Sequence, residues 1–189
     1  MKSFSGKPFP QHETEITTLR RLMVSMDCQS YLEIGARYGD SFHFLASALP
    51  KASRAVAVDM PGGPWGKGES LPFLRKAEAS LNRSAIRASL ILGDSRDPQV
   101  IVETAQRGPF DAVFIDGDHS PEGVRADWEN YGPLGVKIVV FHDIVADQRA
   151  GKRGGKFGVG ALWRELKEEH SYVEIVGKGS PMGIGVILL

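Results

Sequence analysis

The sequence predicts a single α/β domain in which helices cover both faces of a parallel sheet. Short apolar runs typical of buried strands alternate along the chain with longer stretches whose apolar residues recur at helical spacing. Strands joined by such helices require right-handed crossovers, which place the helices on both faces of the sheet. Because 189 residues suffice for one domain, we expect it to span residues 13–189, after a flexible tail over residues 1–12.

The composition is that of an ordinary soluble globular protein. Hydrophobic residues make up 42% of the chain, and 23 basic side chains balance 23 acidic ones. This balance creates no strong field for nucleic acid or an anionic membrane, so we expect neither as a partner. The single cysteine, Cys28, cannot form an internal disulfide. No apolar run has the length of a transmembrane helix or the place of a signal peptide, so we expect a cytoplasmic protein.

The first element is a helix over residues 13–26. Its apolar positions, among them Ile16, Leu19, Met23 and Met26, recur at three- and four-residue spacing. These positions are numerous enough to serve a second copy of the chain, so a homo-oligomer is an open expectation.

Strands and helices then alternate. The strands are short apolar runs closed by glycine or a polar residue, expected at residues 31–34, 55–58, 88–92, 112–115 and 136–141. The intervening helices are expected at residues 41–49, 71–81, 98–106 and 121–131. Pro50 ends the first of these helices, whereas Pro98 and Pro121 stand in the first turns of the last two.

A helix over residues 158–169 precedes two final strands, at 172–176 and 184–188. Only a short glycine-containing turn separates these strands, so they must pair antiparallel, or one must insert beside a distant strand. Residues 146–158 lack periodicity and carry several cations, which predicts either a solvated loop or a mobile lid. The aromatic residues near the helices are expected in the core: Trp128, Phe157 and Trp163.

Acidic and imidazole side chains follow the fourth and fifth strands. They are Asp116, Asp118, His119, His142 and Asp143. The carboxyl ends of parallel strands meet at one edge of an open sheet, and ligands bind there. We therefore expect these side chains to converge on a ligand, although a rim of purely structural polar groups, with Ser120 as a helix N-cap, is the alternative.

This cluster predicts proton transfer, with or without a metal ion. Aspartate oxygens suit Mg²⁺, and imidazole shifts the preference toward Mn²⁺, Fe²⁺ or Zn²⁺. We expect Asp116, His142 and Asp143 as metal ligands, with Asp118 as a substitute. The metal would lower the pKa of a substrate hydroxyl, and His119 would accept its proton. Without a metal, His119 or His142 would be the base unaided.

The first strand runs into a glycine turn. Gly35 allows close approach of a ligand to the backbone, and Gly39 lets the next helix start against the strand. A dinucleotide-binding loop would have its second glycine where Arg37 stands, and Glu33 precedes the turn. Because a carboxylate repels phosphate and attracts a sulfonium or ammonium, an amino-acid-like cofactor is favoured. A strand-to-helix turn without a ligand is the alternative.

The next two strands also end in acids. Asp59 could accept hydrogen bonds from ribose hydroxyls, and Asp94 could accept one from an adenine amino group. Either acid alone could be a helix cap or a solvated loop residue. Acids at the ends of three successive strands indicate a nucleoside-containing cofactor.

Together these motifs resemble the class I S-adenosylmethionine-dependent methyltransferases. The resemblance rests on residues 33–39, Asp59 and residues 93–95, and residues 114–120 with 141–143 are similar to the small-molecule O-methyltransferase subgroup, which includes cephalosporin-hydroxylase-like proteins. It implies a doubly wound, Rossmann-like sheet of seven strands in the order 3-2-1-4-5-7-6, with strand 7 antiparallel and helices on both faces. Two departures from the family pattern are Arg37, where a glycine is common, and His142-Asp143, where some metal-dependent relatives have Asp-Asp or Asp-Asn.

The resemblance also implies a cofactor and a reaction. The implied S-adenosylmethionine site comprises Glu33, Gly35, Ala36, Gly39, Ser41, Asp59, Met60, Gly93, Asp94, Ser95 and Asp116. The implied catalytic residues are Asp116, His119 and His142. The expected function is methyl transfer to a hydroxyl of a small metabolite, assisted by Mg²⁺ or another divalent cation. The alternatives are an NAD(P)-linked oxidoreductase and a non-catalytic binding module of the same fold; a nucleic-acid methyltransferase ranks below them because the chain is neutral and lacks an Asn-Pro-Pro-Tyr-like motif.

Overall fold

The computed structural model describes residues 3–9, 11–63, 68–149 and 157–189. The strands are β1 (Ser30–Ile34), β2 (Arg54–Asp59), β3 (Arg87–Leu92), β4 (Phe110–Ile115), β5 (Gly135–His142), β6 (Ser171–Ile175) and β7 (Ile184–Leu188). The helices are α1 (Glu13–Ser25), α2 (Asp40–Ala46), α3 (Leu71–Arg83), α4 (Pro98–Ala105), α5 (Pro121–Tyr131), α6 (Ala146–Arg149) and α7 (Val159–Glu169), with a 3₁₀ turn η1 (Gly132–Leu134). None of the described helices is both long and apolar enough to cross a membrane.

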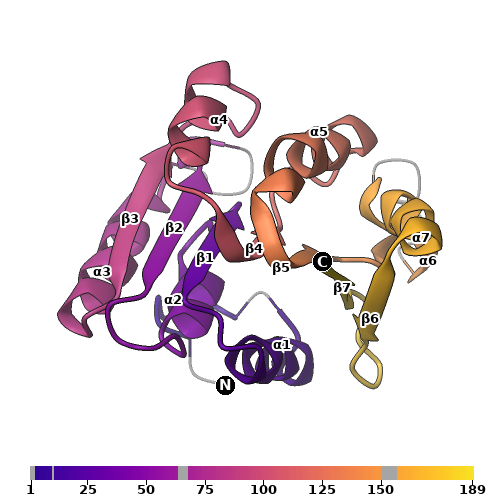
Figure 1. The fold of residues 1–189 in the computed structure, drawn as a ribbon, viewed down its shortest axis with the longest axis horizontal. Coiled ribbons are helices and arrows are strands. Elements are labelled where there is room, and N and C mark those ends of the chain that lie inside the picture. Colours follow the sequence, from indigo (N-terminus) through magenta and orange to yellow (C-terminus); the bar gives the residue numbers. More distant parts are fainter. Residues whose placement is uncertain (1–2, 10, 64–67, 150–156) are drawn as a thin grey trace.

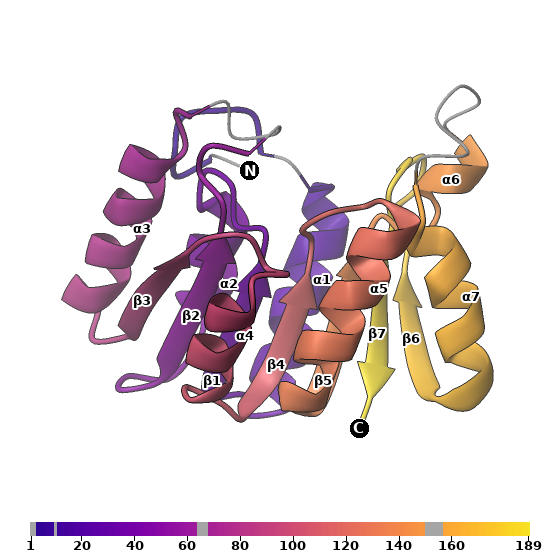
Figure 2. The ribbon, with the colours of Figure 1, turned by 90° about the horizontal axis from the view of Figure 1, so that it is seen from above.

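The strands form one seven-stranded sheet in the order β3-β2-β1-β4-β5-β7-β6 (Figure 1). Pairing is parallel from β3 through β5, and β7 is antiparallel to both β5 and β6. This arrangement confirms the implied topology: β6 and β7 pair antiparallel, and β7 inserts beside β5. Because β1 to β5 are parallel, their carboxyl ends lie along the same edge of the sheet (Figure 2).

The side chains of the sheet divide between two apolar layers. On β1, Tyr31 packs in the layer with α1, α2 and α3, whereas Leu32 and Ile34 pack in the layer with α4, α5 and α7. Figure 1 shows these two sets of helices on opposite faces of the sheet. This alternation follows from the two-residue period of a strand, and it sends Glu33 to the same face as Tyr31.

The apolar stripe of α1 is used inside the domain. Ile16, Leu19 and Met23 are buried in the layer beneath the sheet. These three side chains are therefore used inside the domain, and the homo-oligomer stays a prediction.

The described part of residues 1–12 is packed on the domain, contrary to the expected flexible tail. The backbone N and the Oγ of Ser5 both donate to the carboxylate of Asp40, at 2.8 and 2.5 Å. Phe9 packs edge-on against Phe44, with ring centroids 5.9 Å apart. Figure 2 shows this segment crossing the carboxyl edge of the sheet. The partners of this segment are distant in sequence, so a local pattern of apolar residues does not predict these contacts.

Two further expectations need correction. Residues 146–158, expected as a loop, begin with the short helix α6; residues 150–156 of the expected lid lie outside the described residues. Phe157 is not in the core, since its ring centroid lies 5.7 Å from that of His119 at the carboxyl edge. Trp163, in contrast, is buried as expected.

Candidate active site

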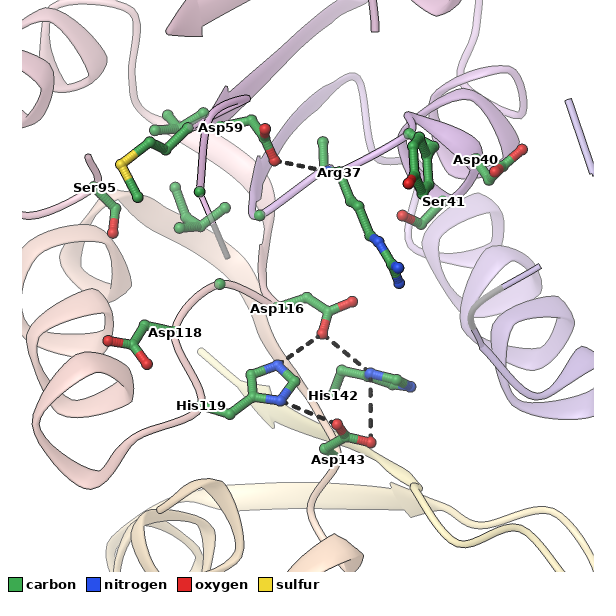
Figure 3. Close-up of a pocket in the computed structure, with 18 of the residues that line it drawn as sticks. Arg37, Asp40, Ser41, Asp59, Ser95, Asp116, Asp118, His119, His142 and Asp143 are labelled. Atoms are coloured by element: carbon green, nitrogen blue, oxygen red, sulfur yellow. Dashed lines mark hydrogen bonds and ion pairs between the residues drawn. The ribbon is translucent and has the colours of Figure 1, made fainter. Parts of the chain in front are cut away.

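A cavity of about 700 Å³ opens at the carboxyl edge of the sheet. Its walls come from the turns after β1, β2 and β3 on one side and from the turns after β4 and β5 on the other (Figure 3). The predicted site residues that line it are Gly35, Ala36, Ser41, Asp59, Met60, Gly93, Asp94, Ser95, Asp116, Asp118, His119, His142 and Asp143. Glu33 and Gly39 do not line it. A cavity of this size suits a small molecule or a cofactor.

The turn after β1 lies directly against the end of β4. Gly35 has φ +88°, and a Cβ on it would lie 2.3 Å from the carbonyl oxygen of Asp116. The backbone N of Asp116 in turn donates to the carbonyl of Ile34 at 2.9 Å. Only glycine allows this approach, which brings the predicted cofactor turn beside the first residue of the predicted acid and imidazole cluster.

Glu33 is fully buried behind this turn. Its two carboxylate oxygens accept hydrogen bonds from the hydroxyls of Tyr31 and Ser41, each at 2.5 Å. Burial raises the pKa of Glu33 to about 8, although the two hydroxyls act in the opposite direction. Since Ser41 lines the cavity and Glu33 does not, Glu33 acts on the cavity by orienting Ser41.

The burial of Glu33 predicts a specific dependence of stability on pH. Its folded-state pKa of about 8 lies above its ordinary value of 4.5, so between these values the folded state holds a proton that the unfolded state has released. The contribution of Glu33 to the free energy of unfolding is therefore present at low pH and lost as pH rises toward 8. Glu33→Gln is expected to flatten this decline in urea unfolding, measured at about pH 5 and about pH 8. The control Glu168→Gln, at an exposed position, should leave the decline in the free energy of unfolding unchanged. An equal decline in Glu33→Gln and the wild type would contradict the raised pKa of Glu33.

Asp59 and Arg37 explain the departure from the common glycine pattern. Arg37 has φ +48°, a left-handed conformation in which glycine is usual. Its backbone N donates to Asp59 Oδ2 at 2.6 Å, which stabilises this conformation. Burial raises the pKa of Asp59 to about 6, against the effect of the Arg37 hydrogen bond. Figure 3 shows Asp59 on the cavity wall opposite the acid and imidazole cluster.

The segment after β3 is held by two contacts. The hydroxyl of Tyr131 donates to the carbonyl of Ser95 at 2.6 Å. The carboxylate of Asp94 accepts from Nε and Nη2 of Arg96, at 3.2 and 3.1 Å, and these bonds lower its pKa. Asp94 is therefore at the predicted position, but in this structure its carboxylate is paired with Arg96.

Asp116, His119, His142 and Asp143 converge at the opposite side of the cavity (Figure 3). Asp116 Oδ1 accepts hydrogen bonds from Nε2 of His119 and Nδ1 of His142, both at 3.1 Å. Nδ1 of His119 lies 3.1 Å from Asp143 Oδ2. Along the chain, a helix and a strand separate Asp116 and His119 from His142 and Asp143, and the parallel sheet brings these residues together.

Asp118 is not part of this cluster, which corrects its expected role as a substitute ligand. Its Oδ1 accepts from the backbone N of Ser120 at 3.0 Å, and Figure 3 shows its carboxylate apart from the histidines. Ser120 itself accepts from the backbone N of Gly123 at 3.0 Å and caps α5, as the structural alternative anticipated for this residue.

The charges of the cluster compensate one another. Burial alone would raise the pKa of Asp116, but His142 and His119 hold it well below its usual range. Burial opposes protonation of His119, yet its bonds to Asp116 and Asp143 raise its pKa to about 10. His119 therefore carries its proton near neutral pH and has both nitrogens engaged, which is unfavourable for the expected general base. For His142, the carboxylates of Asp116 and Asp143 outweigh burial, and its pKa is also raised.

The expected metal ligands do not fit a metal ion in this arrangement. Among the described residues, no group of three or more His, Cys, Asp or Glu side chains is arranged to hold one. Nδ1 of His142 lies 3.1 Å from Asp116 Oδ1 and 3.7 Å from Asp143 Oδ1. This nitrogen donates its proton to Asp116, so a cation could bind it only by replacing that proton.

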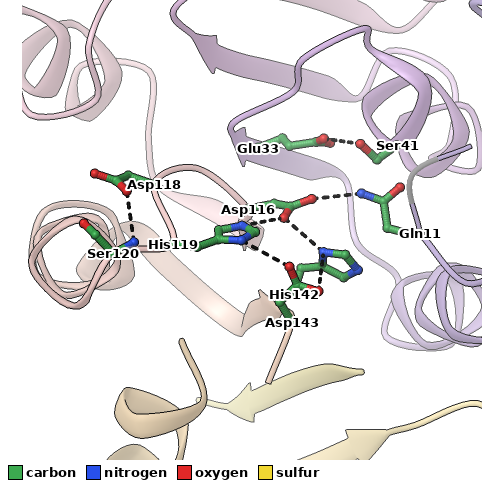
Figure 4. Close-up of polar contacts among 9 residues, drawn as sticks. All are labelled: Gln11, Glu33, Ser41, Asp116, Asp118, His119, Ser120, His142 and Asp143. Atoms are coloured by element: carbon green, nitrogen blue, oxygen red, sulfur yellow. Dashed lines mark hydrogen bonds and ion pairs between the residues drawn. The ribbon is translucent and has the colours of Figure 1, made fainter. Parts of the chain in front are cut away.

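Sequence patterns missed Gln11. Its Nε2 donates to Asp116 Oδ2 at 2.8 Å, and the residue is 6% exposed (Figure 4). Gln11 lines the cavity with Lys7 and Phe9 of the same segment, and Phe157 lines it beside His119. A single glutamine in an aperiodic segment carries no signal that would have identified it.

Several buried polar atoms around the cavity lack a hydrogen-bond partner within the described part of the chain. They include Oε1 of Gln11, Nε2 of His142 and Oδ1 of Asp143. Buried polar atoms rarely stay unpaired, so such atoms at a cavity wall are candidates for contact with a ligand.

Residues 32–144 match a family model described as a methyltransferase domain. An O-methyltransferase from Streptomyces achromogenes involved in tomaymycin synthesis, TomG, solved with S-adenosylmethionine, has 21% identity and a TM-score of 0.70, over 95% of this chain and 81% of that one. An O-methyltransferase from Bacillus cereus, solved with S-adenosylhomocysteine, has 17% identity and a TM-score of 0.67, over 97% and 84% of the two chains. The S-adenosylhomocysteine-bound methyltransferase PaMTH1 of Podospora anserina has 15% identity and a TM-score of 0.68, over 98% and 84%. At these identities the likeness shows a shared fold, and no curated protein sequence matches the chain.

Proposed function

Because the chain belongs to the methyltransferase domain family, we propose that it transfers the methyl group of S-adenosylmethionine to a hydroxyl of a small metabolite. One observation carries the proposal. A single cavity joins the turns after β1, β2 and β3 to the cluster of Asp116, His119, His142 and Asp143. A methyl donor in the first half would thus face a proton-accepting group in the second.

The first half suits the cofactor. Asp59 presents a partly buried carboxylate to ribose hydroxyls, and Ser41 offers a hydroxyl to the methionine moiety. The carboxylates of Asp59 and Asp116 flank the turn after β1, and a positively charged sulfonium is favoured near them. A dinucleotide pyrophosphate would be disfavoured by the same charges.

His142 is the residue best arranged to accept the proton. Asp116 accepts from its Nδ1, so its Nε2 is the nitrogen left to act as acceptor. Asp116 also fixes the orientation of the His142 ring and stabilises the positive charge that forms on it when the proton arrives. The hydroxyl oxygen forms a bond to the methyl carbon, the carbon–sulfur bond breaks with its electron pair remaining on sulfur, and the proton passes to His142. S-adenosylhomocysteine and the methyl ether are the products.

The acceptor is a small hydroxylated molecule in this proposal, and neither nucleic acid nor a membrane is a partner. Among the described residues, Nε2 of His142 has no hydrogen-bond partner, and the proposal makes this nitrogen an acceptor. A hydroxyl of the substrate can donate to it.

The test is a pair of titrations followed by a turnover assay. Calorimetry with S-adenosylhomocysteine should show saturable binding and a rise in melting temperature, whereas NADH should produce neither. The methyl group of labelled S-adenosylmethionine should then appear in an acceptor drawn from a panel of phenols, sugars and hydroxylated amino acids. Binding of NADH without binding of S-adenosylhomocysteine would favour the oxidoreductase instead. Cofactor binding without turnover on any acceptor would favour a binding module.

Methyl transfer is expected to survive removal of divalent cations. Protonated His119 already pairs with both Asp116 and Asp143, and the proposed base is His142, so the proposed reaction calls on no metal. Turnover after treatment with excess EDTA should stay within about twofold of the untreated rate, and added Mg²⁺ or Mn²⁺ should not raise it further. Loss of activity with EDTA and recovery with Mg²⁺ would contradict this arrangement and return Asp116, His142 and Asp143 to the role of metal ligands.

A further inference from the structure

We propose that Gln11 is a positioning residue for the reacting cluster: its amide holds the carboxylate of Asp116 so that Oδ1 faces His119 and His142. This inference rests on the proposed function, because it assigns Gln11 a role in the same site. Gln11 acts through Asp116 and is not itself assigned contact with the reacting atoms.

The two oxygens of Asp116 are divided between different partners. Oδ2 accepts from Gln11 Nε2 at 2.8 Å, and Oδ1 accepts from both imidazoles at 3.1 Å. The terminal torsion of an aspartate is broad and roughly two-fold, so a carboxylate held on one side alone can turn. The amide of Gln11 removes this freedom, and Figure 4 shows it approaching Asp116 from the side opposite His119.

The chemistry of a glutamine suits this task. Its amide is neutral, so it donates a hydrogen bond without neutralising the charge that Asp116 presents to the histidines. A lysine would compete with the imidazoles for that charge, and a glutamate would repel the carboxylate. Because the residue is only 6% exposed, little water is available to replace the amide.

Gln11 is held from both sides in the chain. Glu13, the first residue of α1, follows it closely, and residues 3–9 precede it across the carboxyl edge of the sheet. The preceding segment is tied to Asp40 by two hydrogen bonds from Ser5. Asp40 adjoins Ser41 in the predicted cofactor turn, so one segment spans both halves of the cavity.

The first test needs neither the acceptor nor turnover. Long-range ¹H–¹⁵N spectra at one fixed pH report the hydrogen bonding of each imidazole ring. Gln11→Ala should displace the ring resonances of His119 and His142 and leave those of His170 in place, because His170 contacts Trp128 far from the cluster. The matched control Gln106→Ala, at an exposed position after α4, should displace none. Unchanged His119 and His142 resonances in a folded Gln11→Ala protein would overturn the proposal.

The isosteric variant Gln11→Glu covers the case in which Gln11→Ala does not fold. It keeps the side chain's size but replaces the amide donor with an acceptor, so it should displace the same two sets of resonances. Resonances like those of the wild type in folded Gln11→Glu would equally overturn the proposal. Calorimetry with S-adenosylhomocysteine on the wild type distinguishes failure of the proposed function from failure of the role of Gln11. Absence of binding would contradict the proposed function, whereas the spectra test the role of Gln11 alone.

Turnover adds a double-mutant cycle once an acceptor is in hand. Gln11→Ala should lower kcat by about tenfold to a hundredfold and change the KM for S-adenosylmethionine by less than about twofold. In the Asp116→Asn background the same change should cause no further loss, because Gln11 acts through Asp116. Additive losses, or a loss confined to KM, would overturn the positioning role.

Discussion

Replacing His142 with glutamine is expected to lower kcat by about a thousandfold, the middle of the range that a positioned general base contributes. Nε2 of His142 has no hydrogen-bond partner among the residues that the structure describes, and its Nδ1 donates to Asp116 at 3.1 Å. Glutamine is of similar size but does not accept a proton near neutral pH. The affinity for S-adenosylhomocysteine, measured by calorimetry, should stay within about threefold, because the cofactor half of the cavity is untouched.

His170→Gln is the matched control for this prediction. His170 follows α7 and contacts the ring of Trp128 outside the cavity, so its replacement should leave kcat within about twofold. Equal activity of His142→Gln and His170→Gln would remove His142 from the mechanism. A His142→Gln protein that loses cofactor affinity as strongly as turnover would contradict the division of the cavity into two halves.

Asp59→Ala is expected to act in the opposite way and weaken S-adenosylhomocysteine binding by about ten- to a hundredfold. Hydrogen bonds to a charged group are worth about 1.5–3 kcal/mol, and the variant removes the carboxylate assigned to the ribose. It also removes the acceptor of the Arg37 backbone N, bonded at 2.6 Å, so the left-handed turn loses its support. Calorimetry should show the loss in affinity, and kcat at saturating cofactor should fall much less.

Asp59→Asn separates the two roles of this carboxylate. The asparagine keeps one oxygen that can accept from the Arg37 backbone N, but it lacks a second acceptor for the ribose. Its affinity should therefore lie between those of the wild type and Asp59→Ala. An Asp59→Ala protein that binds S-adenosylhomocysteine as tightly as the wild type would place the cofactor elsewhere.

The α/β class could be predicted because its determinants are local and repeated, whereas the order of the seven strands followed from the resemblance to a known family. Apolar runs such as residues 112–115 and 136–141, separated by helical periodicity, leave few arrangements other than a parallel sheet. The same reasoning predicted that Asp116 and His142 would meet, since each follows a parallel strand. For this prediction, the identity of the residues and the shared direction of the strands were enough.

The parts that sequence patterns missed depend on contacts between distant segments. Gln11 reaches Asp116 only because residues 3–9 pack over α2, and nothing periodic marks that packing. Glu33 was correctly placed at the end of β1, but the two-residue period of the strand buries it behind Ser41. Asp118 turns to the backbone of Ser120, a local cap that competes with the cluster for its carboxylate.

The assignment of the base shows a different limit. His119 and His142 have the same chemistry, so residue type cannot separate them. The structure distinguishes them by their partners: His119 lies between Asp116 and Asp143, whereas His142 keeps Nε2 without one in the described chain. A histidine between two carboxylates is suited to hold a proton and to fix the geometry of both acids.

A crystal structure with S-adenosylhomocysteine tests the shared cavity most directly. The account predicts the ribose against Asp59 and the thioether sulfur between the turn at Gly35 and the ring of His142. Electron density for the ligand outside this cavity, or a sulfur turned away from His142 toward bulk solvent, would contradict it.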